Sequence, residues 1–189
     1  MYTNESDAIN RLLDGKAWLA FAARDFKASE LQNLQARNFR PVSIKVAYDA
    51  LAFIVNKASS DTIISVQDIR NVMSGKATKW SDISNGASSG TITVVFDNAK
   101  SSTVHFVEDS ILGGKPITNP NVAAVNKTAE VIKYVEENPG TIGFIGNNWL
   151  NDKHDSTNLT FNKNIRVMRV SKVHPATPAT SRLPYQYYI

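Results

Sequence analysis

Three consecutive hydroxyl side chains, Ser101, Ser102 and Thr103, stand where an apolar run ends and a helix is predicted to begin. The first turn of a helix has backbone N–H groups without intrahelical acceptors, and the helix dipole makes that end positive. Hydroxyl donors at such a turn suit a tetrahedral oxyanion. A simpler interpretation is that one serine only caps the helix. The triplet therefore predicts either an anion site or a plain N-cap.

Two other kinds of chemistry find less support. Ser101 and His105 lie one helical turn apart, as a nucleophile and its base would if an aspartate came from elsewhere, but no Gly-x-Ser-x-Gly elbow accompanies them. A serine hydrolase using this pair is kept as a minor alternative. Besides His105, the chain has two histidines, His154 and His174, and the spacing of the three is not that of metal ligands. The chain has no cysteine. We predict no catalysis, no metal site and no cofactor.

Composition and charge narrow the classes of function that remain. The chain has 189 residues and a formal net charge of +4, and its lysines and arginines are scattered among acids. Scattered basic residues argue against a nucleic-acid partner. No run approaches the roughly 18 to 20 apolar residues that span a bilayer, so we predict no membrane span. These properties favour a globular domain that binds a small anionic ligand.

Helical and strand patterns alternate along the chain, which predicts an α/β fold. Helices are expected at residues 6–14, 29–36, 65–74, 101–112 and 129–137. Strands are expected at residues 18–23, 42–48, 51–56, 91–96, 142–145 and 165–170, with a loop at 173–182. The completely apolar segment 18–23 predicts a strand that is covered on both faces.

Several segments resemble one family in the family's own order. VAYDALAFIVN at residues 46–56 and IRNVMSGKATKW at residues 69–80 look like the phosphate-binding component of bacterial phosphate ABC transporters. AARD at residues 22–25 resembles the family's ligand loop, and KSST at residues 100–103 resembles its anion turn. NPGTIGFI at residues 138–145 resembles a late strand near its hinge. The resemblance covers nearly the whole chain.

The resemblance implies a two-lobed fold of the periplasmic-binding-protein type (type II), truncated at the N-terminus and the C-terminus. Residues 1–49 would form part of lobe 1, residues 50–146 mainly lobe 2, and residues 147–189 a return segment to lobe 1. The two lobes would close on the ligand by a hinge.

The resemblance also implies a function and a site. The family captures inorganic phosphate outside the cytoplasmic membrane and delivers it to an ABC transporter permease. This location is the periplasm or the cell envelope, and a lipid anchor on the full-length protein is compatible with it. Residues that match the family's ligand positions are Ser6, Asp25, Ser101, Ser102 and Thr103. Asp25 would accept a hydrogen bond from a protonated phosphate oxygen, which sulfate cannot offer.

The chain departs from the family's pattern at the anion turn. The family commonly has an arginine ahead of this turn, whereas this chain has Asp97, and the family's glycine is replaced by Ser102. Arg24 or Lys100 could supply the missing positive charge. A scaffold or adhesion domain without phosphate transport is therefore the main alternative function.

Overall fold

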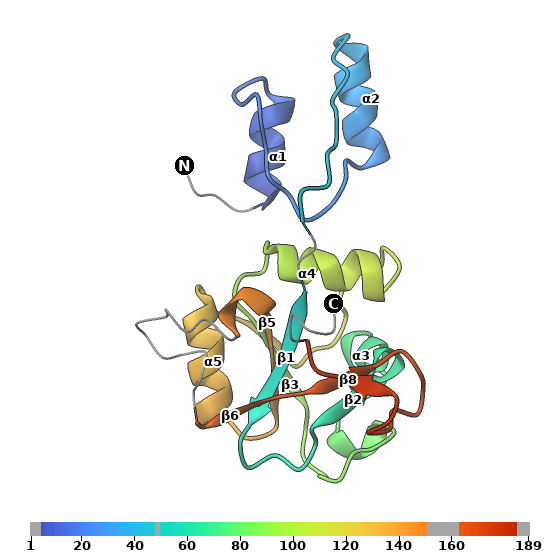
Figure 1. The fold of residues 1–189 in the computed structure, drawn as a ribbon, viewed down its shortest axis with the longest axis vertical. Helices are drawn as coiled ribbons and strands as arrows, with labels where there is room; N and C mark the ends of the chain where they lie inside the picture. Colours follow the sequence, from blue (N-terminus) through green and yellow to red (C-terminus); the bar gives the residue numbers. More distant parts are fainter. Residues whose placement is uncertain (1–4, 48–49, 151–162, 185–189) are drawn as a thin grey trace.

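The computed structural model of the chain describes residues 5–47, 50–150 and 163–184. Most elements belong to one body, in which a five-stranded sheet has helices on both faces and a three-stranded sheet lies beside it. Helices α1 (Glu5–Leu13) and α2 (Ala28–Ala36) form a small unit at one end of this body (Figure 1). The α/β class expected from the sequence is confirmed.

The small N-terminal unit has few buried residues. Ile9 of α1 and Leu34 of α2 are almost completely buried, as the apolar face of each helix requires. Lys27 caps α2, and its backbone N–H donates to the carboxylate of Glu30 at 2.7 Å. Glu30 thus fixes the turn that leads from residues 24–26 into α2.

The sequence predicted strands at 18–23 and 42–48 in this unit. Both predictions are wrong for the residues that the structure describes. Segments 17–23 and 41–47 belong to neither sheet. Trp18 is 93% exposed, and Val42 and Ile44 are 82% and 77% exposed. Apolar composition therefore favoured two strands that do not form here, and these side chains are exposed rather than covered.

The five-stranded sheet has the order β4-β3-β5-β1-β6. Its strands are β1 (Leu51–Asn56), β3 (Thr93–Phe96), β4 (Val122–Ala124), β5 (Thr141–Gly146) and β6 (Ile165–Val167). β3 is parallel to both β4 and β5, whereas β1 is antiparallel to β5 and β6. Because Leu51 pairs with Gly146, the start of β1 lies at the edge where β5 ends. That edge also receives the chain from the N-terminal unit.

Helices cover the two faces of this sheet. On one face α5 (Thr128–Glu137) packs its Val131 and Val135 against Ile54 of β1. On the other face lie α3 (Val66–Met73) and the continuous helix formed by α4 (Ser102–Phe106) and the π-helix η2 (Val107–Ile111). The predicted helix ending near residue 112 is confirmed.

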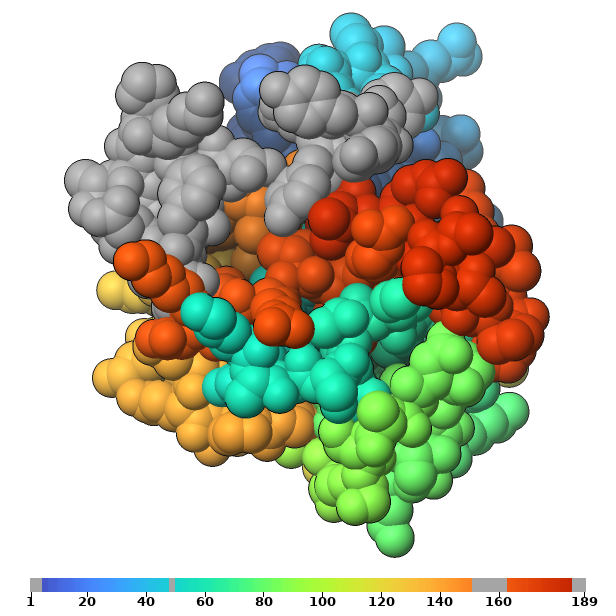
Figure 2. Space-filling model, turned by 60° about the horizontal axis from the view of Figure 1, so that its bottom comes forward, coloured from blue at the N-terminus to red at the C-terminus, as the bar shows by residue number. Residues whose placement is uncertain are grey.

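One chain segment passes directly from a strand of the larger sheet into a strand of the smaller one. The expected strand at 165–170 divides into β6 and β7 (Arg169–Ser171), with fully buried Met168 between them. β7 pairs with β2 (Ile63–Ser65) and with β8 (Ser181–Arg182), which lies in the expected loop. Figure 2 shows this segment in orange and red beside the teal residues of β1 and β2.

Gly143 is required where α5 approaches the centre of the sheet. A Cβ at this position would lie 2.7 Å from Val135 Cγ2 and 2.8 Å from Ile54 Cγ1. We expect Gly143→Ala to lower the free energy of unfolding by about 1–3 kcal/mol through overpacking, measured by urea denaturation. Gly90→Ala is the control, because a Cβ there meets nothing within 4 Å. Equal destabilisation by both variants would contradict the packing argument.

Candidate functional site

The N-terminal unit contacts the body through a hydrogen bond between two helices. Ser6, in the first turn of α1, has its Oγ 3.2 Å from Nε2 of His105 in α4. The His105 side chain is 22% exposed, and its backbone N–H donates to the carbonyl of Ser101 one turn earlier. This bond therefore joins the first turn of α1 to a residue that lies one turn after the start of α4.

The hydroxyl triplet opens α4 just after β3, at the edge where the parallel strands β3 and β5 end. Ligands of α/β proteins typically bind outside this edge of a parallel sheet. Ser101 is the N-cap, and its Oγ accepts from the backbone N–H of Val104 at 3.3 Å. Thr103 is buried, whereas Ser102 is exposed. The N-cap interpretation thus holds for Ser101, and Ser102 is the exposed residue of the triplet.

Arg24 lies beside the start of α1 but is bound by carboxylates. Its two terminal nitrogens donate to the two carboxylate oxygens of Glu30, each at 2.9 Å, and Nη1 also donates to the carbonyl of Asp25. The Glu30 hydrogen bonds raise the pKa of Arg24, with further contributions from the charges of Glu5 and Asp109, although burial opposes them. Arg24 therefore carries a positive charge that is already largely balanced.

Asp25, the expected selectivity residue, is exposed. The buried carboxylate at this junction is that of Glu5, the residue before Ser6, whose side chain is 5% exposed. Its Oε1 accepts the backbone N–H of Ala23 at 2.6 Å. Sequence patterns gave no indication of this contact, because an acidic residue in the first turn of a helix is commonplace.

The acid that stands in place of the family's arginine points toward α5. Asp97 Oδ2 accepts a hydrogen bond from Thr128 Oγ1 at 3.2 Å, while Oδ1 is buried without a hydrogen-bond partner among the described residues. Lys100 is exposed, and its backbone N–H donates to the side chain of Asn98 at 2.8 Å. Lys100 is therefore accessible to an anion at the turn, whereas Asp97 would repel one.

The geometry gives little support to a hydrolytic site at His105. Its imidazole bonds to Ser6, while the Ser101 hydroxyl accepts from a backbone N–H. Nδ1 of His105 lies 4.0 Å from Glu108 Oε2, which is an ion-pair separation rather than a hydrogen bond. In the part of the chain that the structure describes, which excludes His154, no group of three His, Cys, Asp or Glu side chains could hold a metal ion.

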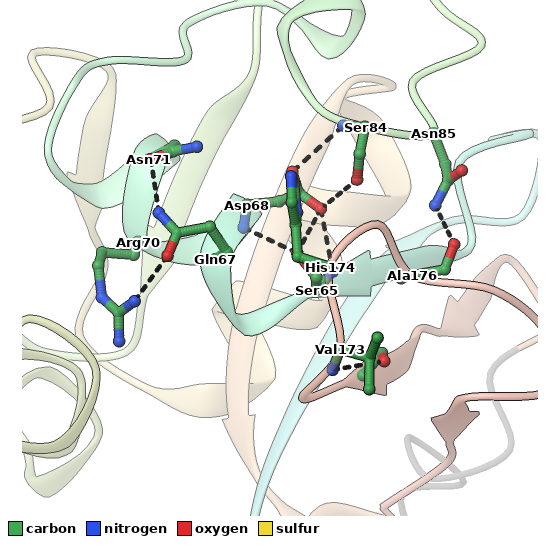
Figure 3. A network of polar contacts seen from close by, with 11 residues as sticks. Ser65, Gln67, Asp68, Arg70, Asn71, Ser84, Asn85, Val173, His174 and Ala176 are labelled. Atoms are coloured by element: carbon green, nitrogen blue, oxygen red, sulfur yellow. Dashed lines mark hydrogen bonds and ion pairs between the residues drawn. The ribbon is translucent and has the colours of Figure 1, made fainter.

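A second serine, histidine and aspartate cluster lies at the start of α3 (Figure 3). The carboxylate of Asp68 accepts hydrogen bonds from Ser65 Oγ at 2.6 Å and from Ser84 Oγ at 2.7 Å. His174 Nδ1 lies 3.0 Å from Ser65 Oγ and 3.6 Å from Asp68 Oδ1. In a catalytic triad the histidine stands between serine and aspartate, but here serine bonds directly to aspartate. The cluster therefore caps α3 and ties the segment after β7 to it.

An open depression lies at the opposite edge of the five-stranded sheet, where β1 ends. The residues that line it are Asn56, Lys57, Ala58, Glu136, Asn164 and Arg166. Because β1 runs between the two edges of the sheet, this depression is separated by the length of that strand from the junction of α1 and α4.

The chain matches the PBP superfamily domain over residues 2–189 and belongs to that family. The Staphylococcus aureus phosphate-binding protein PstS is 28% identical over 141 residues, which are 74% of this chain and 42% of that protein. The chain thus spans less than half the length of this relative.

Solved structures share the fold. An ABC-type phosphate transport receptor from Vibrio cholerae matches with a TM-score of 0.68 and 23% sequence identity. The match covers 91% of this chain and 64% of the receptor chain. A putative phosphate ABC transporter substrate-binding protein with bound phosphate, from Clostridium perfringens, has a TM-score of 0.68 and 22% identity over 93% and 64%. The periplasmic-binding-protein type of fold expected from the sequence is confirmed.

We expect the Asp68 cluster to make stability depend on acid pH. Burial raises the pKa of Asp68, but hydrogen bonds from Ser65 and Ser84 lower it by more, so that the pKa lies below its ordinary value. The carboxylate therefore stabilises the fold at pH values above about 4, and this contribution is lost as the pH falls through the folded-state pKa. Asp68→Asn should cost about 1–3 kcal/mol at pH 7 and progressively less below pH 4, measured by urea denaturation.

Asp14→Asn is the matched control for that experiment, because Asp14 forms an exposed ion pair with Lys16. It should change stability little at any pH. A constant difference between the wild type and Asp68→Asn from pH 7 to pH 2.5 would contradict the role assigned to this carboxylate.

Proposed function

We propose that this chain is part of an extracytoplasmic solute-binding protein that captures inorganic phosphate and delivers it to an ABC transporter permease. The observation that carries the proposal is the contact between the first turn of α1 and α4, the helix that begins at the edge where the parallel strands end. The names of the similar proteins supply the ligand, since they are phosphate-binding proteins and phosphate receptors.

The proposed ligand contacts are the exposed hydroxyl of Ser102, the first turn of α4, and Ser6 with its neighbour His105. Unpaired N–H groups and hydroxyl donors at a helix start would hold the phosphate oxygens. Arg24 and Lys100 would contribute positive charge nearby. No step of this function alters the ligand covalently, so we assign the protein no enzymatic activity.

The proposed location is the periplasm or the cell envelope. In the described parts of the chain, no helix has the length and apolar character to cross a membrane. The permease that would receive the ligand is part of the proposal. Residues 1–49 and 50–146 are proposed to belong to different lobes, which agrees with the small N-terminal unit standing apart from the body (Figure 1).

A scaffold or adhesion domain is the second candidate, favoured by one observation. The guanidinium of Arg24 is bound by Glu30 and lies close to Glu5, so the junction offers an anion little unbalanced positive charge. Isothermal titration calorimetry of the purified chain with phosphate and with sulfate separates the candidates. Transport predicts heat with phosphate and none with sulfate, whereas a scaffold predicts no heat with either.

We expect Ser102→Ala to weaken phosphate binding about tenfold in that titration, since one charge-assisted hydrogen bond is worth roughly 1.5–3 kcal/mol. The variant should fold normally, because Ser101 rather than Ser102 caps the helix. Ser110→Ala, an exposed serine at the far end of the same helix, is the control and should bind like the wild type. Unchanged affinity in Ser102→Ala would remove this residue from the proposed site.

A further inference from the structure

The carboxylate of Glu5 is buried in the N-terminal unit beside Arg24, which we propose lies near the ligand. Its position next to Ser6 puts it at the start of α1, and it contacts both the loop N–H of Ala23 and the side chain of Arg24. We propose that Glu5 is a built-in anion, which means that its carboxylate occupies contacts that an anionic ligand would otherwise make. A ligand would have to displace this carboxylate in order to bind. This inference rests on the proposed function, because it assigns a regulator to the same site.

The contacts of Glu5 are those that an oxyanion would make. Oε1 accepts the backbone N–H of Ala23 at 2.6 Å, a short, charge-assisted hydrogen bond. Oε2 lies 3.8 Å from Nε of Arg24. The side chain is 5% exposed, so its carboxylate has lost almost all contact with solvent. A backbone N–H and a guanidinium thus converge on one carboxylate.

The match between Glu5 and Arg24 is incomplete. Oε2 of Glu5 and Nε of Arg24 are both buried, and neither has a hydrogen-bond partner among the described residues. A buried donor without an acceptor is destabilising, and a tetrahedral anion with four oxygens could accept from this N–H where the carboxylate does not reach it. The unpaired Nε of Arg24 is therefore a donor that a ligand would satisfy and Glu5 leaves unsatisfied.

Charge explains why Glu5 would limit binding. Arg24 interacts with three carboxylates, those of Glu30, Glu5 and Asp109. On the α4 side Glu108 lies 4.0 Å from His105. A phosphate that approached Arg24 with Glu5 in place would meet an excess of negative charge in a partly dehydrated site, where repulsion is screened less than in water. Removal of the Glu5 charge should therefore strengthen anion binding.

The test is Glu5→Gln, which keeps the size of the side chain and an oxygen for the Ala23 N–H but removes the charge. Isothermal titration calorimetry at pH 7.5 should show phosphate binding at least tenfold tighter than in the wild type, and a gain for sulfate as well. Without ligand, the variant should melt at a lower temperature than the wild type, and added phosphate should raise its melting temperature by more. Glu5→Ser gives the same test if the glutamine variant does not fold.

Two variants control for charge alone. Glu30→Gln removes a carboxylate from the same guanidinium on the side facing α2, and Glu137→Gln removes an exposed one that pairs with Lys133 in α5. Glu137→Gln should bind phosphate within about threefold of the wild type, whereas Glu30→Gln, which frees charge on the same guanidinium without vacating the contact with Ala23, should gain less than Glu5→Gln. A gain in Glu137→Gln equal to that in Glu5→Gln would show a general charge effect and overturn the inference.

Other outcomes separate the inference from the proposed function. If the wild type binds phosphate and Glu5→Gln binds it equally or more weakly, Glu5 is not a competitor, and the inference fails while the function stands. If Glu5→Gln gains sulfate but neither form binds phosphate, the built-in anion stands and the phosphate assignment fails. If no form binds either anion, both fail.

Discussion

The contact between Ser6 and His105 is the interaction on which the candidate site depends. It joins a helix of the small N-terminal unit to a helix of the main body and brings together groups that are 99 positions apart in the chain. The body contributes a rigid platform to this contact, since α4 follows directly from buried β3. The N-terminal unit contributes Glu5, Arg24 and the start of α1. The properties of the site therefore belong to the junction rather than to either part.

The body is held rigid by close packing at the centre of its sheet. On one face three rings form an aromatic cluster: the centroid of Phe144 lies 4.6 Å from that of Phe53 and 4.7 Å from that of Phe96. On the other face Gly143 lets α5 approach the sheet. These contacts fix β3 and β5, so the helix start at Ser101 has a defined position. By contrast, apolar side chains of the N-terminal unit such as Trp18 lie in solvent, which agrees with a chain that spans only part of the length of its relatives.

Local signals in the sequence predicted the helices well and the sheets less well. Ser65 and Ser101 are the N-caps of α3 and α4, at the starts of two helices that the sequence predicted, because capping and apolar spacing involve residues within one or two turns. The expected strands at 18–23 and 42–48 required pairing with distant chain, which composition does not report. For the same reason the sequence indicated the hydroxyl triplet of the site but neither the burial of Glu5 nor its contact with Ala23. The assignment of Asp25 and its neighbours to the ligand remains a prediction.

The passage of one segment through both sheets has a mechanical consequence. β6 is paired with β1 in the larger sheet and β7 with β2 in the smaller one, and only Met168 separates them. A shift of β6 by one residue would turn every side chain of β7 to the opposite face and pull Met168 out of the interior. The two sheets are therefore locked in register with each other, and an insertion or deletion anywhere in residues 165–171 would disrupt both at once.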